Sequence, residues 1–262
     1  MTRLPVTPNR DLGQHFLVDE NIVAVAGRLA ELDPDDVVLE IGPGLGVLTD
    51  FLAERVRLVH AVELDRSLEP HLRERISERE NVEILFGDAL TLPLHELDPP
   101  PGKLVANLPY QVATPLVVES LDGLPTVDVW CVMVQREVAD RYFAEPRTKS
   151  YGAVSVLLQL TAERTGFHPV ARTVFRPAPN VDSALVAFER RRSWGVEYEP
   201  LKRVVQGAFA HRRKTLANSL ELVGLADRAR AVAALAELGQ PASVRAEALA
   251  PEEFALLAQA LV

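Results

Sequence analysis

The stretch that decides the fold is residues 36–46, Asp-Val-Val-Leu-Glu-Ile-Gly-Pro-Gly-Leu-Gly. The apolar residues Val37, Val38, Leu39 and Ile41 predict a strand that is buried on both faces. Three alternate glycines follow the strand directly, and leucines at helical spacing come after them. Glycine lets the backbone turn tightly or approach a ligand closely. The order of strand, glycine turn and helix is typical of the nucleotide-binding opening of a doubly wound α/β sheet.

The glycine spacing indicates which ligand this turn suits. A dinucleotide fingerprint has the spacing G-x-G-x-x-G, which faces a pyrophosphate, whereas this chain has G-x-G-x-G. The next predicted strand, residues 58–62, leads into Glu63, which lies 21 residues after Gly42. A carboxylate at that place can accept hydrogen bonds from two ribose hydroxyls. A ribose without a phosphate favours S-adenosylmethionine, and the alternative is a tight turn of an ordinary α/β protein.

Length and composition favour one large domain with a small appendage. The chain has 262 residues, of which 48% are hydrophobic. No apolar run approaches the roughly 18 residues of a membrane span, and the N-terminus lacks the apolar core of a signal peptide. The single cysteine, Cys131, lies in an apolar run and is typical of an inert buried thiol. We therefore expect a cytoplasmic protein without disulfides, and the histidine spacing predicts no metal site. We also expect a monomer, although the sequence itself does not give the oligomeric state.

The order of predicted elements gives the fold class. Strands and helices alternate between residues 37 and 134, which predicts a mostly parallel sheet with helices on both faces. Two later strand-like stretches, near 162–168 and 184–188, are joined by an irregular loop and predict an antiparallel edge pair. From about residue 193 the chain reads as wholly helical. We therefore expect a doubly wound, Rossmann-like sheet in residues 1–192 and a small all-helical domain in residues 193–262.

A tetrapeptide at the end of the predicted strand 103–107, Asn107-Leu108-Pro109-Tyr110, should lie beside the glycine turn, because ligands bind off the carboxyl ends of such strands. Its groups suit the exocyclic amine of adenine, whose lone pair is delocalised into the ring. The Asn107 side-chain oxygen and the Leu108 carbonyl could hold the two N–H groups and turn the lone pair outward. Pro109 has no competing N–H, and Tyr110 offers a face for stacking. The alternative is a strand-end turn with a buried tyrosine.

Asp88 and a cluster of basic residues can each be interpreted as functional or as purely structural. Asp88 follows the third predicted strand, where it could accept a hydrogen bond from a bound adenine or cap a short turn. The net charge of −9 argues mildly against a nucleic-acid partner, but residues 190–220 contain eight Lys or Arg and two Glu. A local basic face is enough to hold a phosphate backbone, and the alternative is a solvated surface.

Several segments together resemble the rRNA adenine N6,N6-dimethyltransferases, and they occur in the family's order over nearly the whole chain. The segments are Leu-Gly-Gln-His-Phe-Leu at 12–17, Glu-Ile-Gly-Pro-Gly-Leu-Gly at 40–46, Asn-Leu-Pro-Tyr at 107–110, Gln-Arg-Glu-Val-Ala at 135–139, Tyr-Gly at 151–152, Phe-Arg-Pro-Ala-Pro-Asn-Val-Asp-Ser at 175–183 and Phe-Ala-His-Arg-Arg-Lys-Thr-Leu at 209–216. The chain is most similar to the branch that dimethylates two adjacent adenines in a hairpin near the 3′ end of 16S rRNA.

The resemblance implies S-adenosylmethionine as the cofactor, 16S rRNA within the small ribosomal subunit as the partner, and a role in ribosome maturation. It implies that Tyr110 and Phe175 sandwich the target base, next to Asn107, Leu108 and Pro109. The residues implied to line the cofactor site are His15, Leu17, Gly42, Gly44, Glu63, Asp88 and Asn107. Those implied to grip rRNA are Arg212, Arg213 and Lys214. One departure is Asp11, which follows Arg10 where the family usually carries Lys or Arg.

Three other functions fit parts of the sequence. The nearest is the macrolide-resistance branch, which methylates one adenine of 23S rRNA; the Asn-Leu-Pro-Tyr and Arg-Arg-Lys-Thr-Leu segments favour the small-subunit enzyme. A ribosome-assembly or transcription factor that has lost catalysis would not need Glu63, Asp88, Asn107 and Tyr110 together. A small-molecule methyltransferase would not need the basic helical tail.

Overall fold

The computed structural model describes residues 4, 6–9, 12–191 and 197–261. Arg10 and Asp11, where the sequence departs from the family, lie outside the described residues, as does Arg192 of the basic stretch. Packing divides the chain into two compact units. The first contains residues 1–139 and 164–190, and the second contains residues 140–163 and 191–262.

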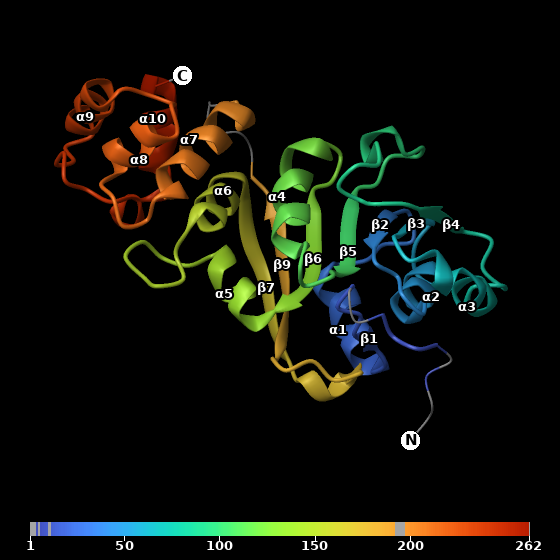
Figure 1. Ribbon diagram of the computed structural model, residues 1–262. Helices are drawn as coiled ribbons and strands as arrows, with labels where there is room; N and C mark the ends of the chain where they lie inside the picture. The colour runs from blue at the N-terminus through green and yellow to red at the C-terminus, as the bar shows by residue number, and fades with distance from the viewer. Residues whose placement is uncertain (1–3, 5, 10–11, 192–196, 262) are drawn as a thin grey trace. The chain divides into compact units, whose positions relative to one another are not determined.

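A seven-stranded sheet forms the centre of the first unit, and its strands lie side by side with helices around them (Figure 1). In spatial order the strands are β4 (Val82–Phe86), β3 (Leu58–Glu63), β2 (Val37–Ile41), β5 (Lys103–Asn107), β6 (Val129–Gln135), β9 (Ser183–Arg190) and β7 (Ala162–Val170). The pairs from β4 to β6 are parallel, and β9 runs antiparallel to β6. The mostly parallel sheet with an antiparallel addition, predicted from the sequence, is confirmed.

The strand β2 sits where the strand order reverses. It pairs with β3 on one side, in register from Val37 opposite Leu58 to Ile41 opposite Val62, and with β5 on the other. All five of its residues are buried, which explains why four of them are apolar. The chain fills β3 and β4 first and then crosses over to β5 and β6. A reversal of this kind opens a crevice at the carboxyl ends of the strands.

Short helices surround this sheet. The helix α1 (Glu20–Leu29) begins after Asp19, whose side chain accepts a hydrogen bond from the Asn21 N–H at 2.9 Å. It packs against α2 and β6 and contributes to the main hydrophobic core. The remaining helical elements that begin in this unit are α2 (Val47–Ala53), η1 (Arg66–Leu68), α3 (Glu69–Arg75), η2 (Leu94–Glu96), α4 (Ala113–Gly123), α5 (Arg136–Tyr142) and η3 (Arg172–Val174).

A second, two-stranded sheet joins distant parts of the sequence. The strand β1 (Phe16–Leu17) pairs antiparallel with β8 (Phe175–Arg176), so Phe16 lies opposite Arg176. The Val18 N–H continues this pairing to the Val174 carbonyl at 3.0 Å. Two-residue strands carry no periodicity, so sequence patterning did not predict them. The pairing fixes residues 12–17 against the body of the first unit.

The second unit is built from helices. The element bounds are α6 (Ala153–Thr161), α7 (Tyr198–Ala210), α8 (Leu216–Leu222), α9 (Arg228–Glu237), η4 (Ala246–Ala248) and α10 (Pro251–Leu261). Helix α6 packs against α7 and α10, and the Tyr151 hydroxyl donates to the Leu249 carbonyl at 2.9 Å. Residues 140–163 therefore pack with the C-terminal helices, although the predicted boundary at 192/193 assigned them to the first domain. Among the described residues, no helix combines the length and apolar character needed to span a membrane.

Candidate active site

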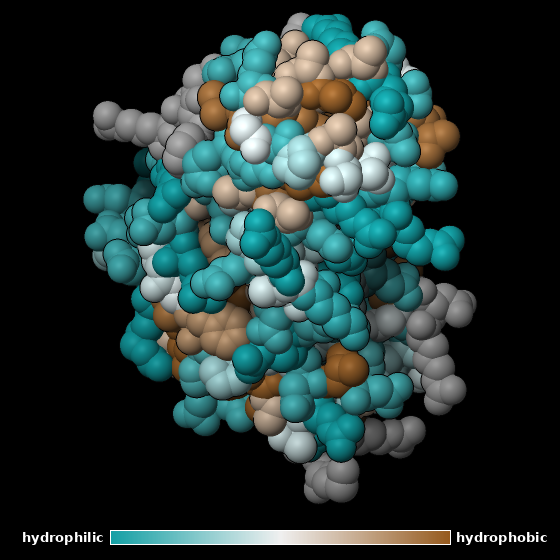
Figure 2. Space-filling model, turned by 90° about the vertical axis from the view of Figure 1, so that its left-hand side faces the viewer, coloured by the Kyte–Doolittle hydropathy of each residue, from teal (hydrophilic) through white to brown (hydrophobic). Residues whose placement is uncertain are grey.

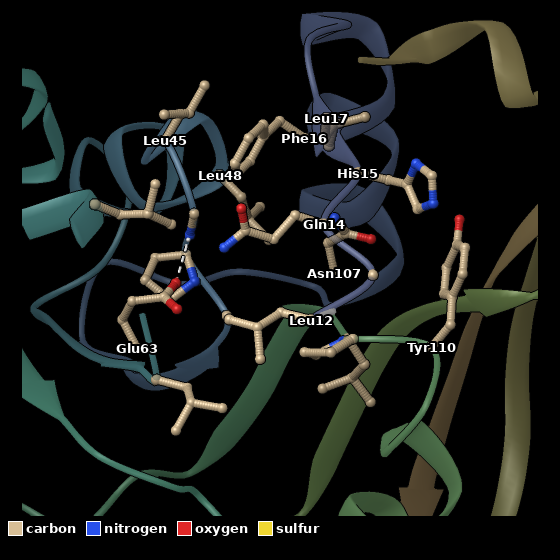
Figure 3. A pocket seen from close by; sticks show the side chains of 18 of the residues that line it. Leu12, Gln14, His15, Phe16, Leu17, Leu45, Leu48, Glu63, Asn107 and Tyr110 are labelled. Carbon is tan, nitrogen blue, oxygen red and sulfur yellow. Dashed lines mark hydrogen bonds between the residues drawn. The ribbon is translucent and has the colours of Figure 1, made fainter. Parts of the chain in front are cut away.

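A cavity opens at the carboxyl ends of β2, β3 and β5, at the place where the strand order reverses. The volume of this cavity is about 180 Å³. Figure 3 shows the arm that carries Leu12 to Leu17 along one wall, Glu63 at one end and Tyr110 at the other. The lining residues are Leu12–Leu17, Glu40, Gly42–Leu45, Val47, Leu48, Glu63, Leu64, Leu68 and Asn107–Val112. The cavity thus collects most of the predicted site residues.

The glycine turn forms one wall of the cavity because its backbone adopts a conformation that side chains disfavour. Gly42 and Gly44 have φ angles of +76° and +59°. A Cβ on Gly44 would lie 3.0 Å from the Phe16 ring, and one on Gly42 would lie 3.4 Å from Pro109. The turn can therefore pass close to both the arm and the Asn-Leu-Pro-Tyr segment, as the sequence predicted for a ligand-binding glycine loop.

Glu63 is held at the end of β3 by two backbone N–H groups. Its Oε2 accepts from Gly44 at 3.0 Å, and its Oε1 accepts from Asp65 at 2.8 Å. The first of these bonds appears in Figure 3. Burial raises the pKa of this carboxyl, while the hydrogen bonds from Asp65 and Gly44 oppose the rise. The carboxylate is thus fixed in position beside the glycine turn, with lone pairs left for a ligand.

Asn107, at the end of β5, presents a buried oxygen with no partner. Its Oδ1 is buried and makes no hydrogen bond within the described part of the chain. Figure 3 shows the side chain between Glu63 and Tyr110. The next residue, Leu108, is buried and donates its N–H to the Met133 carbonyl at 3.1 Å. A buried acceptor without a donor costs free energy, so this oxygen is suited to receive an N–H from a ligand.

Tyr110 lies at the far end of the cavity, with contacts at its hydroxyl and at its ring. Its hydroxyl lies 2.7 Å from the Ser183 Oγ, and burial raises the pKa of the phenol. The His15 ring stacks against it with 5.8 Å between ring centroids and 27° between planes. His15 in turn contacts the Pro177 carbonyl through Nδ1 at 2.7 Å. The predicted stacking residue is therefore part of the cavity and faces the arm (Figure 3).

Two predicted site residues lie elsewhere. Phe175 is fully buried and belongs to the hydrophobic core, because β8 pairs with β1 and turns the ring inward. In this structure the Phe175 ring does not line the cavity, and its stacking on a target base stays a prediction. Asp88 is exposed, does not line the cavity, and accepts the Leu90 N–H at 2.9 Å. Its side chain thus caps a turn, which was the structural alternative for this residue.

Three polar residues of the cavity, Gln14, Glu40 and Gln111, were not predicted as site residues. Gln14 donates through Nε2 to the Asp65 Oδ2 at 2.7 Å and so ties the arm to the loop after β3. Glu40 lies inside the buried strand β2, is 1% exposed and lines the cavity. An acidic residue between apolar neighbours of a fully buried strand was the available signal for Glu40. For Gln14 the signal was its place beside the glycine of the segment 12–17.

The burial of Glu40 predicts a pH dependence of stability. Burial is the main cause that raises the Glu40 pKa to about 8; the negative charge of Glu63 adds to the rise and the Thr49 hydroxyl opposes it. The unfolded chain loses this proton near pH 4.5 and the folded chain near pH 8, so folding stability falls between these values. The free energy of unfolding should decrease by about 1.4 kcal/mol per pH unit in this interval, and Glu40→Gln should remove this decrease.

Urea unfolding at pH 5.5 and pH 8 measures the effect. The difference between the parent protein and Glu40→Gln should grow with pH, with Glu40→Gln the more stable variant at pH 8. Glu78→Gln, on an exposed residue, is the matched control and should follow the parent. A pH-independent difference between Glu40→Gln and the parent would show that Glu40 ionises normally.

The predicted rRNA-contacting residues lie in the second unit, in the turn after α7. Arg212, Arg213 and Lys214 are all exposed. Arg212 donates to the Tyr151 carbonyl at 3.3 Å and lies 3.7 Å from the Glu247 carboxylate. Within the described residues the side chains of Arg213 and Lys214 form no ion pair. Arg213 and Lys214 are therefore more available than Arg212 to bind a phosphate group. The described residues contain no group of three or more His, Cys, Asp or Glu that could hold a metal ion.

The strand order, the glycine turn and the strand-end Glu63 define a Rossmann-like methyltransferase. The sequence model of the family "Ribosomal RNA adenine dimethylase" matches residues 6–259, and the chain belongs to this family. It is 48% identical over 250 residues to Ribosomal RNA small subunit methyltransferase A of Rubrobacter xylanophilus, covering 95% of this chain and 94% of that protein. The protein of the same name from Moorella thermoacetica is 40% identical over 269 residues, covering 98% and 93%.

Solved structures agree with this assignment of the fold. A dimethyladenosine transferase from Plasmodium falciparum superposes with a TM-score of 0.78 at 23% identity and covers 93% of this chain and 96% of that one. The 23S rRNA methyltransferase ErmE superposes with a TM-score of 0.67 at 32% identity, covering 94% and 99%. The family model and the sequence relatives confirm, at the level of the family, the resemblance inferred from the sequence segments.

Proposed function

We propose that this chain transfers methyl groups from S-adenosylmethionine to N6 of two adjacent adenines in a hairpin near the 3′ end of 16S rRNA. The observation that carries this proposal is the buried, unpartnered Oδ1 of Asn107 in the cavity at the end of β5. The names of relatives at 40–48% identity support the small ribosomal subunit as the acceptor. A ribosomal substrate implies a cytoplasmic protein that contributes to ribosome maturation, and we propose that it acts as a monomer.

The residues at the Glu63 end of the cavity fit S-adenosylmethionine. Glu63 is already fixed by Gly44 and Asp65, so its remaining lone pairs can accept ribose hydroxyls. Gly42, Gly44, His15 and Leu17 line the same cavity. The bound cofactor supplies an electrophilic methyl group on its sulfonium sulfur. The chain holds the donor in a site whose walls are mostly apolar, so the methyl group is kept from competing water.

Glu63→Ala should weaken S-adenosylmethionine binding. The ribose loses its acceptor, and the Gly44 and Asp65 N–H groups lose theirs, so the cost in binding free energy is about 1–3 kcal/mol. This corresponds to a rise of about 5- to 140-fold in the dissociation constant, which titration calorimetry measures directly. Glu96→Ala, on an exposed helical residue, is the control. An unchanged dissociation constant for Glu63→Ala would remove Glu63 from the cofactor site.

The residues at the other end fit the target amine. The Asn107 oxygen and the Leu108 carbonyl accept the two N–H groups of N6 and hold the nitrogen with its lone pair turned toward the methyl donor. Pro109 supplies no N–H that could compete for those acceptors. Tyr110 provides a stacking face for the base. Because the nitrogen becomes positively charged as it is alkylated, it releases its proton readily to water and needs no side-chain base.

We propose that residues 193–262 form the domain that holds rRNA, through Arg212, Arg213 and Lys214. The face of the molecule in Figure 2 supports a polar partner, because hydrophilic side chains predominate on it and apolar ones form small, separate patches. Replacing Arg213 and Lys214 by alanine should weaken binding to small subunits at every salt concentration. The slope of log affinity against log salt should fall by about 0.7–0.9 for each lost contact. Arg212→Ala should change the slope less, since Arg212 lies close to Glu247.

The salt dependence can be measured by filter binding at several potassium chloride concentrations. Lys149→Ala, which removes an exposed charge in a loop of the same unit, controls for net charge. If the slope of the Arg213 and Lys214 double variant equals that of the parent, the turn after α7 is an ordinary solvated surface.

The proposed function is tested by methyl transfer to unmethylated small subunits. We expect radiolabel from S-adenosylmethionine to appear as N6,N6-dimethyladenosine after nucleoside digestion, with the labelled positions at two adjacent adenines of 16S rRNA. The alternative function is methylation of one adenine of 23S rRNA, and the structural similarity to ErmE favours it. Label in protein-free 23S rRNA, and none in small subunits, would replace the first proposal by the second.

A further inference from the structure

The hydroxyl of Tyr110 is tied to a serine of another strand. It lies 2.7 Å from the Ser183 Oγ, and within the described residues this is the only polar contact that the phenol makes. Ser183 is fully buried, whereas Tyr110 is half-buried at the end of the cavity (Figure 3). A buried hydroxyl needs a hydrogen-bond partner, and the partner of Ser183 is a residue of the proposed base site.

The central sheet holds the backbone of Ser183 in place. Ser183 begins β9 and lies opposite Gln135, the last residue of β6. The preceding residue, Asp182, accepts the Arg136 N–H through its carbonyl at 2.9 Å. Because β6 lies between β5 and β9, the strand that leads to Tyr110 is about 10 Å from that of Ser183, which is two strand spacings. The Tyr110 side chain therefore reaches across the end of β6 to an anchor fixed by strand pairing.

We infer that Ser183 is a positioning residue for the target adenine, because it fixes the plane of the Tyr110 ring on which that base stacks. This inference rests on the proposed function, since it requires that the target adenine binds at this end of the cavity. A tyrosine side chain has only two torsions, so a ring held at its backbone and at its hydroxyl keeps its orientation. Without the bond the ring can turn, and ordering it again costs about 2- to 12-fold in affinity.

A purely structural serine is the alternative, and it would change stability alone. Ser183 is not one of the residues that line the cavity, so it acts through Tyr110 and not on a ligand directly. Removal of its hydroxyl should therefore weaken capture of the base and leave the affinity for S-adenosylmethionine close to that of the parent. Ser120 offers a matched control, because it is also buried and its Oγ accepts the Trp130 indole N–H at 2.9 Å, while neither of them lines the cavity.

The first test measures binding of 8-vinyladenosine, a fluorescent adenosine that keeps the N6 amine and is quenched when it stacks on a ring. We expect Ser183→Ala and Tyr110→Phe each to weaken binding about 2- to 12-fold, because each removes one side of the same hydrogen bond. The double variant should bind no more weakly than the weaker single variant, as expected for a shared contact. Ser183→Thr keeps the hydroxyl and should bind more tightly than Ser183→Ala, and Ser120→Ala should match the parent.

The second test measures single-turnover methylation of small subunits at saturating S-adenosylmethionine. The subunit concentration that gives half the maximal rate should rise in Ser183→Ala by the same factor as in the first test. The maximal rate should stay close to the parental value, because the lost binding is common to the ground and transition states. Urea unfolding shows whether Ser183→Ala and Ser120→Ala are folded. Tyr110→Phe breaks the same bond from the other side, so it decides the question if Ser183→Ala does not fold.

Other results overturn the inference. Parental affinity for 8-vinyladenosine in Tyr110→Phe or in folded Ser183→Ala would leave Ser183 with a structural role. Losses that multiply in the double variant would show that the two hydroxyls act separately, and an absence of quenching with the parent would show that no base stacks on Tyr110. A parent protein that quenches 8-vinyladenosine but labels no small subunits would contradict the proposed function and leave Ser183 as the positioning residue of an adenine site.

Discussion

Replacement of Asn107 by alanine should slow methyl transfer about 10²- to 10³-fold, which is the usual cost of losing one preorganised polar group at a reacting centre. The target amine keeps the Leu108 carbonyl but loses the second acceptor that fixes its lone pair. The fold should survive, because the Asn107 Oδ1 has no hydrogen-bond partner in the described part of the chain and its removal leaves no donor unpaired. Single-turnover transfer to small subunits at saturating S-adenosylmethionine measures the effect.

Two further variants test whether a slower rate in Asn107→Ala comes from the loss of the acceptor oxygen. Asn107→Asp retains an acceptor oxygen and should be faster than Asn107→Ala, although its added negative charge is costly in a buried site. Asn21→Ala, on an exposed residue of α1, should transfer at the parental rate. If Asn107→Ala transfers methyl groups at the parental rate, Asn107 does not hold the target amine, and the active site lies elsewhere.

Replacement of Phe175 by alanine should lower the free energy of unfolding by about 3–5 kcal/mol, the range for deletion of a fully buried phenylalanine ring. The ring lies in the same core as Leu17, Met133 and Leu185, so the variant leaves a cavity that this packed region fills only in part. Urea unfolding at constant pH measures this change in the free energy of unfolding. Phe175→Leu retains most of the apolar volume and should cost considerably less.

The same pair of variants distinguishes a core residue from a base-stacking one. Folded Phe175→Leu should methylate small subunits at close to the parental rate, because its side chain does not line the cavity. A folded Phe175→Leu protein that transfers methyl groups a hundredfold more slowly would show that Phe175 contacts the target base.

The sequence predicted the parts of the site that depend on local pattern. The buried run of β2, the alternate glycines and the polar residues that end β3 and β5 follow from periodicity and from where parallel strands end. Asn107 and Glu63 reach one cavity for this reason. The resemblance to a family supplied further residues, among them His15 and Phe175, but not which way their rings turn.

The structural features that the sequence pattern does not reveal depend on pairing over long distances. The direction of the Phe175 ring is decided by the pairing of β8 with β1, and neither two-residue strand has a period to detect. Asp88 has the residue type and the strand-end position of a ligand-binding carboxylate. In the structure, however, its side chain accepts a hydrogen bond from the Leu90 N–H of the turn that follows. The assignment of residues 140–163 to the helical unit depends on the packing of α6, which composition along the chain does not reveal.

The pairing of β1 with β8 also sets the order in which a nascent chain can gain its cofactor site. The arm that forms one cavity wall emerges from the ribosome before its strand partner, residues 175 and 176, which follows about 160 residues later. A chain released as far as β6 holds the glycine turn, Glu63 and Asn107, but it lacks the β1–β8 pairing that completes the attachment of that wall. Contacts between such distant residues form late in folding. The enzyme therefore completes its binding site only after residues 175 and 176 have been synthesised, and ligand present earlier cannot stabilise the folding intermediate through the finished site.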